Sequence, residues 1–246
     1  MPSVLFSFAH PDDESFCGAG LAGWCAAHNA PVTLVCATRG DAGKAGEKDR
    51  SGAPDDVGAA RALELAAAAR ILGIKDVELW DFGDKRLSET KVEEIRPKLA
   101  AAIRRCQPDV VLTFDPNGFN LHVDHIAISR FTSDAIAAAA DPRWYPDAGP
   151  AHAVRRLLWT SPLPPWAASR SRQPTAEPGV DFLLDITPWR EMKRGALRAH
   201  RTQHASIDRH FFQQPDVEQI LSVEAYRHAW GPPLARRPSD DIFEGL

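Results

Sequence analysis

The 246-residue sequence lacks an excess of positive charge and any long apolar run, and each absence excludes a class of protein. Lys and Arg together number 29 against 33 Asp and Glu, which gives a formal net charge of −4. A general nucleic-acid binder would instead present a basic face. No segment approaches the ~18 apolar residues that a membrane-spanning helix requires. We therefore expect neither nucleic acid nor a membrane as a partner.

Cysteine is also scarce, and the four cysteines, Cys17, Cys25, Cys36 and Cys106, include no C-x-x-C pair. Their spacing argues against a zinc–thiolate site. Each lies among apolar residues, which is typical of reduced core cysteines in a cytosolic protein. The amino terminus lacks the basic region, apolar core and cleavage site of a secretory signal. These features predict a cytoplasmic location.

Short apolar runs alternate with segments of helical character along the first 140 residues. Strands are predicted at residues 4–9, 31–38, 76–82 and 108–115. Helices are predicted at residues 15–28, 56–73, 88–106 (with Pro97 as a kink or break) and 122–140. This alternation favours an α/β fold, a doubly wound, Rossmann-like and mostly parallel sheet with helices on both faces.

The last third of the sequence is less regular but predicts additions to the same fold. Further strands are expected at residues 154–161, 180–187 and 223–230, and a further helix at 188–204. The Pro-rich segment 162–178 predicts a long loop, a kind that is often functional or mobile. We expect one domain over residues 1–246, with a metal-binding core in 1–140 and a substrate loop and C-terminal extension in 141–246.

Ionisable and polar side chains follow each of the first four predicted strands. They are His10, Asp12 and Asp13, then Arg39 and Asp41, then Asp81 and Asp84, and finally Asp115, Asn120, His122, Asp124 and His125. Ligands of open α/β sheets bind beyond the carboxyl ends of the strands. The sequence therefore predicts that these side chains meet at one edge of the sheet.

The segment "AHPDDE" at residues 9–14 predicts half of a metal site. Pro11 suits a first helical position, which would make His10 the helix cap and place His10 and Asp13 on one side of the turn. Asp12 would then lie beside the metal as a general base. Acidic residues also favour a helix N-terminus through the helix dipole. That alternative does not explain the histidine or the absence of a basic neighbour.

The segment "HVDH" at residues 122–125 repeats this pattern. One of His122 and His125 can complete a three-ligand site while the other acts on substrate. Asp124, between them, can orient a histidine and raise its pKa. The pattern is weak alone, but beside the first motif it predicts a catalytic metal site.

Other polar motifs have ordinary interpretations. Arg61 and Glu64 have the spacing of a surface ion pair on a helix. Lys193, His200 and Gln203 are expected to be solvated on the late helix. No role follows for Glu14.

Taken together, these motifs resemble the LmbE-like family of de-N-acetylases, also called the N-acetylglucosaminyl-phosphatidylinositol deacetylase family. The resemblance is carried by "AHPDDE" (9–14), "TRGDAG" (38–43), "RALELAAAARILG" (61–73), "HVDH" (122–125) and "KRGALRAHRTQ" (193–203). It implies a doubly wound α/β fold with one zinc at the edge of the sheet. It further implies zinc ligation by His10, Asp13 and His125.

The resemblance also implies roles for the neighbouring residues. Asp12 would be the general base. His122, kept protonated by nearby carboxylates, would stabilise the oxyanion or protonate the leaving amine, and Asp124 would orient it. Arg61 and Asp84 would contact substrate or support the site. Asn120 stands where some members have a tyrosine that assists the oxyanion, and we place it with the substrate-binding residues.

The implied activity is a zinc-dependent de-N-acetylase that hydrolyses the acetamide of an N-acetylglucosamine-type, or related N-acyl, small-molecule conjugate. One Zn²⁺ per chain is expected, and other divalent metals such as Fe²⁺ suit the same ligands. Two alternatives are a metal-dependent phosphoesterase, which usually needs a second metal, and a non-catalytic sugar-binding protein. The oligomeric state is left open.

Overall fold

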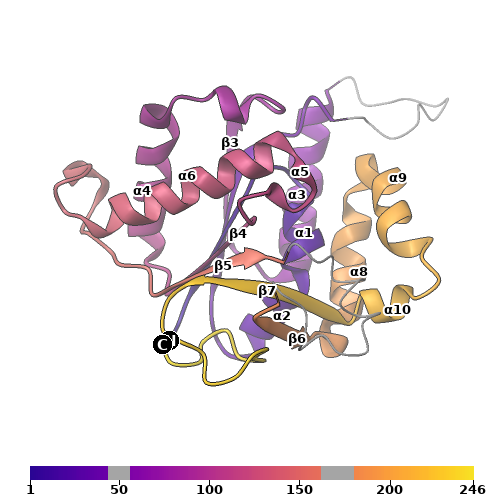
Figure 1. Ribbon diagram of the computed structural model, residues 1–246. Coiled ribbons are helices and arrows are strands. Elements are labelled where there is room, and N and C mark those ends of the chain that lie inside the picture. Colours follow the sequence, from indigo (N-terminus) through magenta and orange to yellow (C-terminus); the bar gives the residue numbers. More distant parts are fainter. Residues whose placement is uncertain (44–55, 162–179) are drawn as a thin grey trace.

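A computed structural model describes residues 1–43, 56–161 and 180–246, and in these residues one seven-stranded sheet forms the centre of the molecule (Figure 1). The predicted loop at 162–178 lies outside the described residues. The strand order is β3-β2-β1-β4-β5-β7-β6. The strands are β1 (Val4–Phe8), β2 (Val32–Thr38), β3 (Asp76–Phe82), β4 (Val110–Thr113), β5 (Arg156–Thr160), β6 (Phe182–Asp185) and β7 (Val223–Trp230).

Helices cover both faces of this sheet. They are α1 (Asp13–Cys17), α2 (Ala19–Ala27), α3 (Val57–Leu72), α4 (Val92–Cys106), α5 (Gly118–Leu121), α6 (Val123–Ala140), α8 (Arg190–Ala199), α9 (His204–Ile207) and α10 (Val217–Ile220). Short 3-10 turns occupy Leu87–Glu89, Pro146–Ala148, Thr187–Trp189 and Arg201–Gln203, and a π-helical turn occupies Asp208–Phe212. Helices α4 and α6 pack together on one face, while α8 packs on α2 and α3 on the other.

The parallel part of the sheet follows from its apolar strands. Every residue of β1 is buried, and β1 pairs in parallel with β2 on one side and β4 on the other. A strand covered on both faces must be apolar on both faces. The sequence of such a strand is therefore a continuous apolar run and does not alternate between apolar and polar residues. β5 continues the parallel order, whereas β7 is antiparallel to both β5 and β6. The predicted mostly parallel, doubly wound α/β fold is confirmed.

Three helix predictions require correction. The helix expected at 188–204 is shorter, because α8 covers Arg190–Ala199 and is flanked by separate 3-10 turns. The helix expected at 15–28 is two helices, α1 and α2, which meet at Gly18. A Cβ atom at Gly18 would lie 2.7 Å from the ring of Phe6, so only glycine allows this close packing on β1. Of the kink or break expected at Pro97, the break is absent, because α4 continues through Pro97 as one helix. Burial of Ile95, Leu99 and other apolar residues of α4 offsets the single backbone hydrogen bond that proline removes.

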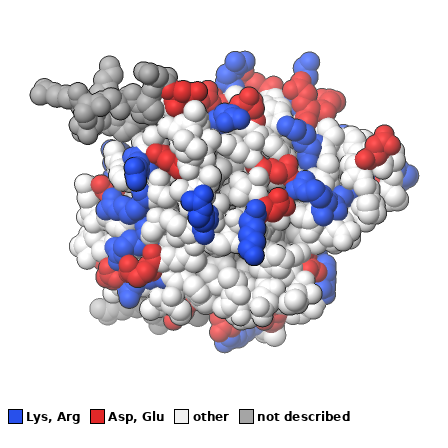
Figure 2. All heavy atoms as spheres, turned by 180° about the vertical axis from the view of Figure 1, so that it is seen from behind, with Lys and Arg blue, Asp and Glu red and all other residues white. Residues whose placement is uncertain are grey.

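On the side of the molecule seen in Figure 2, Lys and Arg side chains are interspersed with Asp and Glu among the described residues. In the same residues, no helix combines the length and the apolar character needed to cross a membrane.

Candidate metal centre and active site

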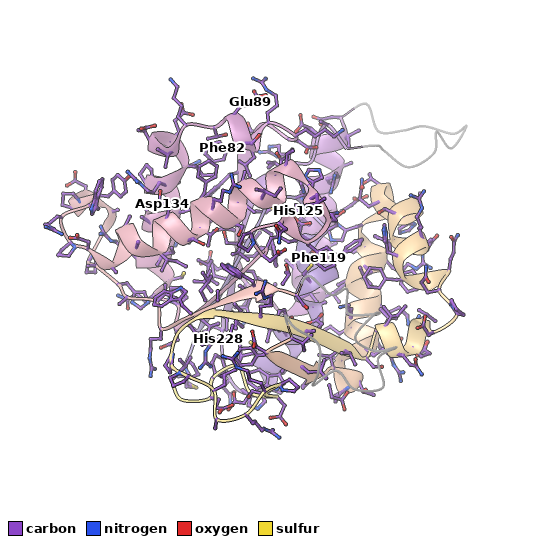
Figure 3. The ribbon with its side chains drawn as sticks, in the orientation of Figure 1. Phe82, Glu89, Phe119, His125, Asp134 and His228 are labelled. Atoms are coloured by element: carbon purple, nitrogen blue, oxygen red, sulfur yellow. The ribbon has the colours of Figure 1, made fainter. Side chains whose placement is uncertain are left out.

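A pocket of about 350 Å³ lies beyond the carboxyl ends of β1 and β4. His125 and Phe119, two of its lining residues, lie near the centre of the molecule where α6 begins (Figure 3). The pocket is lined by His10, Asp12, Asp13, Phe16, Cys17, Gly43, Arg61, Asp84, Lys85, Phe114, Phe119, Asn120, His122, His125, Gln203, Ser206 and His210. All nine predicted site residues except Asp124 therefore line one pocket, and Asp124 lies directly behind His10.

The turn after β1 differs from the expected geometry. Helix α1 begins at Asp13, and its N-cap is Asp12 rather than His10. Asp12 has φ 121° and ψ −27°, outside the regions that an L-residue ordinarily occupies. Such a conformation costs on the order of 1–3 kcal/mol and persists only where surrounding contacts hold it.

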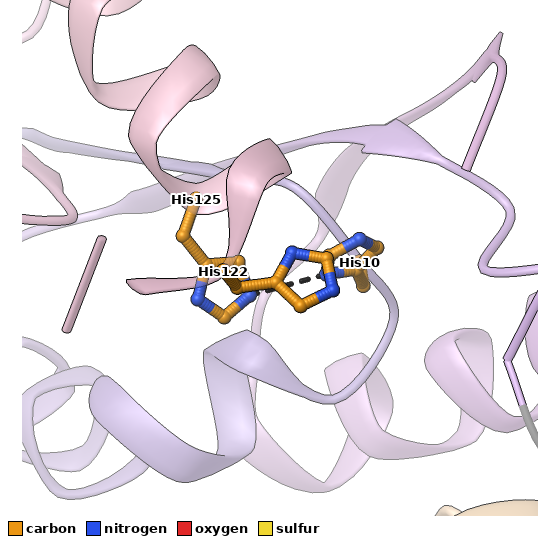
Figure 4. Close-up of side chains that lie close together, drawn as sticks. All are labelled: His10, His122 and His125. Atoms are coloured by element: carbon orange, nitrogen blue, oxygen red, sulfur yellow. Dashed lines mark hydrogen bonds between the residues drawn. The ribbon is translucent and has the colours of Figure 1, made fainter. Parts of the chain in front are cut away.

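Three side chains converge on one point of the pocket floor. His10 Nδ1 lies 3.2 Å from His125 Nε2 and 3.6 Å from Asp13 Oδ2, and His125 Nε2 lies 3.3 Å from Asp13 Oδ1. Figure 4 shows the facing rings of His10 and His125, with His122 beside them. Ligand atoms around a tetrahedral zinc with bonds of ~2.0–2.1 Å are about 3.3–3.4 Å apart. These residues therefore fit a metal ion of this size.

The contacts of Asp13 fix its carboxylate in this arrangement. Oδ2 accepts hydrogen bonds from the backbone N–H groups of Ala9 (3.2 Å) and His10 (2.8 Å). Burial alone would raise the pKa of Asp13, but His125 and His10 hold it well below its usual range. The carboxylate is thus kept ionised, which metal ligation requires.

The opposite nitrogen of His10 faces two further carboxylates. His10 Nε2 lies 3.1 Å from Asp124 Oδ2 and 3.2 Å from Asp84 Oδ1. Asp124 also accepts hydrogen bonds from the N–H groups of Lys85 (2.6 Å) and Leu87 (3.0 Å). Its carboxylate is therefore directed at His10 and not at His122, which Asp124 contacts through its backbone N–H instead. A carboxylate behind a metal-binding histidine fixes the ring and strengthens it as a ligand.

His122 is the N-cap of α6, and this position determines which of its ring nitrogens can donate a hydrogen bond. Its Nδ1 accepts a hydrogen bond from the backbone N–H of Asp124 at 3.2 Å. In the neutral ring the proton then resides on Nε2, which makes this atom a donor. Burial and the nearby His10 lower the pKa of His122, against the opposing effect of the Asp124 and Asp13 carboxylates.

Asp12 and Arg61 form a pair at the wall of the pocket. Arg61 Nη2 lies 3.2 Å from Asp12 Oδ2 and also donates to the backbone carbonyl of Pro11, and Nη1 donates to Gly40 O at 3.1 Å. Arg61 is only 4% exposed, so its predicted surface ion pair with Glu64 is wrong. Burial raises the pKa of Asp12 to about 6, against the opposing effect of Arg61.

Asp84 and Asn120 complete the predicted set. Besides facing His10, the Asp84 carboxylate accepts a hydrogen bond from the Ala42 N–H at 2.8 Å. Asn120 Oδ1 accepts one from the His122 N–H at 3.1 Å, so its amide NH₂ is the group that can donate elsewhere. Asp84 thus supports the metal-side residues, while Asn120 lies at the exposed rim.

A family model described as PIG-L, GlcNAc-PI de-N-acetylase, matches residues 5–136, which is more than half of the chain. The chain belongs to the GlcNAc-PI de-N-acetylase family. The matched span carries both the turn after β1 and the start of α6. The predicted family resemblance is confirmed.

Individual proteins that this chain is similar to match more than nine-tenths of its length. The 1D-myo-inositol 2-acetamido-2-deoxy-alpha-D-glucopyranoside deacetylase of Streptomyces griseus subsp. griseus is 32% identical over 287 residues, covering 99% of this chain and 88% of its own. N,N'-diacetylchitobiose deacetylase from Pyrococcus horikoshii matches with a TM-score of 0.68 at 22% identity, over 92% of this chain and 82% of its own. GalB, the 4-carboxy-2-hydroxymuconate hydratase of Pseudomonas putida KT2440, matches with a TM-score of 0.73 at 22% identity, over 96% and 99%.

The two structural likenesses show the fold alone. Because one of these structures is a deacetylase and the other a hydratase, activity within this fold has to be argued from the site.

Two residues of the C-terminal third of this GlcNAc-PI de-N-acetylase family member, Lys193 and His200, were predicted to be solvated but are buried. Lys193 Nζ bonds Glu224 at 2.6 Å, and His200 Nε2 lies 2.7 Å from Glu14 Oε1, all with side chains at most 1% exposed. Ser206 and His210, which had no supporting pattern in the sequence, line the pocket. The one available signal was the match of residues 193–203 to a family motif.

Proposed function

We propose that the protein is a metal-dependent de-N-acetylase that hydrolyses the acetamide of an N-acetylglucosamine-type small-molecule conjugate, with one Zn²⁺ held by His10, Asp13 and His125. The observation that carries this proposal is the convergence of these three side chains on one point, with Asp12 and His122 on the same pocket. The relatives named above support the substrate class, since the Streptomyces protein is named for a 2-acetamido sugar linked to inositol.

His10, Asp13 and His125 would hold a divalent cation, which would polarise the acetamide carbonyl and lower the pKa of a water molecule towards ~7. Asp12 accepts a proton from the attacking water and returns it to the departing amine nitrogen. Arg61 keeps the Asp12 carboxylate in place through the 3.2 Å contact. The products are acetate and the free amine.

His122 contributes as a neutral hydrogen-bond donor. Its Nε2–H, left as the donor by the cap interaction at Nδ1, stabilises the negative charge that develops on the carbonyl oxygen. The amide of Asn120 provides a second donor at the rim of the pocket. Asp124 and Asp84 act on His10 rather than on substrate.

The test is an amine-release assay over a panel of N-acetylated sugars, on protein stripped of metal and then reloaded with Zn²⁺ or Fe²⁺. We expect turnover only in the reloaded protein. Asp12→Asn should bind one equivalent of metal and lose most activity, whereas His10→Ala should lose both. Full activity of the metal-free protein would overturn the proposal.

The same samples separate the alternatives. A phosphoesterase would bind two equivalents of metal and release phosphate. A second possible set of ligands adds Asp84 and Asp124 to His10, which already belongs to the proposed zinc site. A second ion therefore has no separate set of ligands among the described residues. One bound metal without turnover on any N-acetylated sugar would instead indicate a sugar-binding protein.

A further inference from the structure

We infer that Glu14 and His200 form a positioning pair that holds the Pro11–Asp12 peptide, and with it the Asp12 carboxylate, in the orientation the reaction requires. The inference rests on the proposed function and concerns residues that do not themselves touch substrate. It assigns a role to the third acid of the turn after β1 and to the buried histidine at the end of α8.

The peptide between Pro11 and Asp12 needs such support because of its backbone geometry. Asp12 has φ 121°, so this peptide is rotated away from the direction that an ordinary helix entry would give it. On the other side of Asp12 the backbone is fixed, because its carbonyl accepts from Ser15 N–H and Phe16 N–H, both at 2.9 Å. The φ angle of Asp12 therefore depends on the contacts that hold the preceding peptide.

Charged side chains hold both polar groups of that peptide. The N–H of Asp12 donates to Glu14 Oε2 at 3.0 Å, and the carbonyl of Pro11 accepts from Arg61 Nη2. If the peptide rotated to relax φ, a backbone donor and a backbone acceptor would both lose their partners, in a place where burial makes unpaired groups costly. The strained conformation and the position of the Asp12 side chain are thus maintained together.

His200 fixes the Glu14 carboxylate in turn. Its Nε2 lies 2.7 Å from Glu14 Oε1, which also accepts from Ser15 Oγ at 2.6 Å. His200 is fully buried at the C-cap of α8. The next turn is tied to α3, because Glu64 accepts from the N–H and the hydroxyl of Thr202 at 2.9 and 2.7 Å. The end of α8 is therefore anchored to the helix that carries Arg61.

The chain offers a matched control for a purely structural role. Glu224 is also buried and ion-paired, with Lys193 of the same helix α8, and it also accepts backbone N–H groups, those of Gly20 and Leu21 at 2.9 and 2.8 Å. Those hydrogen bonds support α2 and do not reach the Asp12 peptide. Replacing Glu224 should therefore destabilise the fold without displacing the base.

The experiment compares Glu14→Ala, Glu14→Gln and Glu224→Gln, each in wild-type and Asp12→Ala backgrounds, all loaded with Zn²⁺. We expect Glu14→Ala to lower kcat for acetamide hydrolysis about 100-fold, the effect of a misplaced catalytic group, with KM little changed. In the Asp12→Ala background it should have no further effect. Glu14→Gln, whose amide oxygen can still accept from the Asp12 N–H, should recover much of kcat, and Glu224→Gln should leave kcat unchanged.

A second readout does not depend on activity. A crystal structure of Glu14→Ala, or of Glu14→Gln if the alanine variant does not fold, should show φ of Asp12 relaxed in the former and kept in the latter. An equal loss of kcat in both backgrounds, or an unchanged Asp12 backbone in Glu14→Ala, overturns the inference. If the wild-type protein releases no amine from any substrate, the proposed function fails, and the crystal structures still decide the positioning role.

Discussion

Gly40 offers a way to disturb the Asp12–Arg61 pair without touching either residue. It lies in the turn after β2 with φ +65°, and a Cβ atom there would be 2.5 Å from Cζ and Nη1 of Arg61. The backbone carbonyl of Gly40 also accepts from this guanidinium. Gly40→Ala should therefore displace the group that holds the Asp12 carboxylate and the Pro11 carbonyl.

The loss of stability expected for Gly40→Ala has two parts, and a second glycine, Gly73, allows them to be measured separately. Gly73 has a similar φ of +72°, but a Cβ atom there would meet nothing within 4 Å. Both substitutions place an alanine in the left-handed conformation, which costs about 1–2 kcal/mol of stability. This cost is partly offset by ~0.4–1 kcal/mol, because alanine makes the unfolded chain less flexible. Only Gly40→Ala adds the cost of forcing atoms into packed space, about 1–3 kcal/mol.

The assays are denaturant unfolding and steady-state kinetics on the metal-loaded protein. Gly40→Ala should be less stable than Gly73→Ala by about 1–3 kcal/mol and should lose about 10–100-fold in kcat. Gly73→Ala should retain wild-type kcat. If Gly40→Ala matched Gly73→Ala in both measurements, the argument that Arg61 needs the space above Gly40 would be refuted.

Three further predictions concern stability and metal binding. Arg104 is 2% exposed and donates to backbone carbonyls within residues 138–149, so Arg104→Met should lower the urea-unfolding free energy by about 3–5 kcal/mol. The hydrogen bond from Arg143 lowers the pKa of Asp141 from 3.8 to about 2, so this pair stabilises the fold above pH 3.8 and ceases to do so as the pH falls through about 2. Asp141→Asn should accordingly unfold more readily than wild type near neutral pH and equally at the acid limit. Zn²⁺ should raise the Tm of the metal-stripped wild type and leave that of His125→Ala unchanged, as scanning calorimetry can show.

The strands and the meeting of the two histidine motifs could be predicted because both follow from a local pattern. A strand buried on both faces is a continuous apolar run, and the residue after it lies at the edge of the sheet. His10 follows β1, His125 lies in the first turn of α6 after β4, and β1 and β4 are neighbours. Two segments 115 residues apart therefore meet without any further information.

The direction of side chains within the site could not be predicted. Whether Asp124 faces His122 or His10 depends on the backbone N–H groups of Lys85 and Leu87, which come from the loop after β3. The geometry of Asp12 depends in the same way on contacts from Arg61. Spacing along the sequence specifies which residues come near each other, but not which hydrogen bonds they choose.

The buried charges of α8 were missed for a related reason. A lysine or histidine on an amphipathic helix has the same local sequence whether it faces water or a carboxylate. The acids that decide the matter stand 31 residues after Lys193, at Glu224, and 186 residues before His200, at Glu14. Only the tertiary fold brings each pair together.

The place of β7 in the sheet has a consequence for the order of assembly. β7 follows every other strand in sequence, yet it lies between β5 and β6, and β6 has no other strand partner in the described sheet. During synthesis the sheet therefore lacks its bridging strand until residue 230 has left the ribosome. Glu224, which fixes the start of α2, arrives with that strand. The residue that supports the start of α2 is thus made after all the other strands of the described sheet.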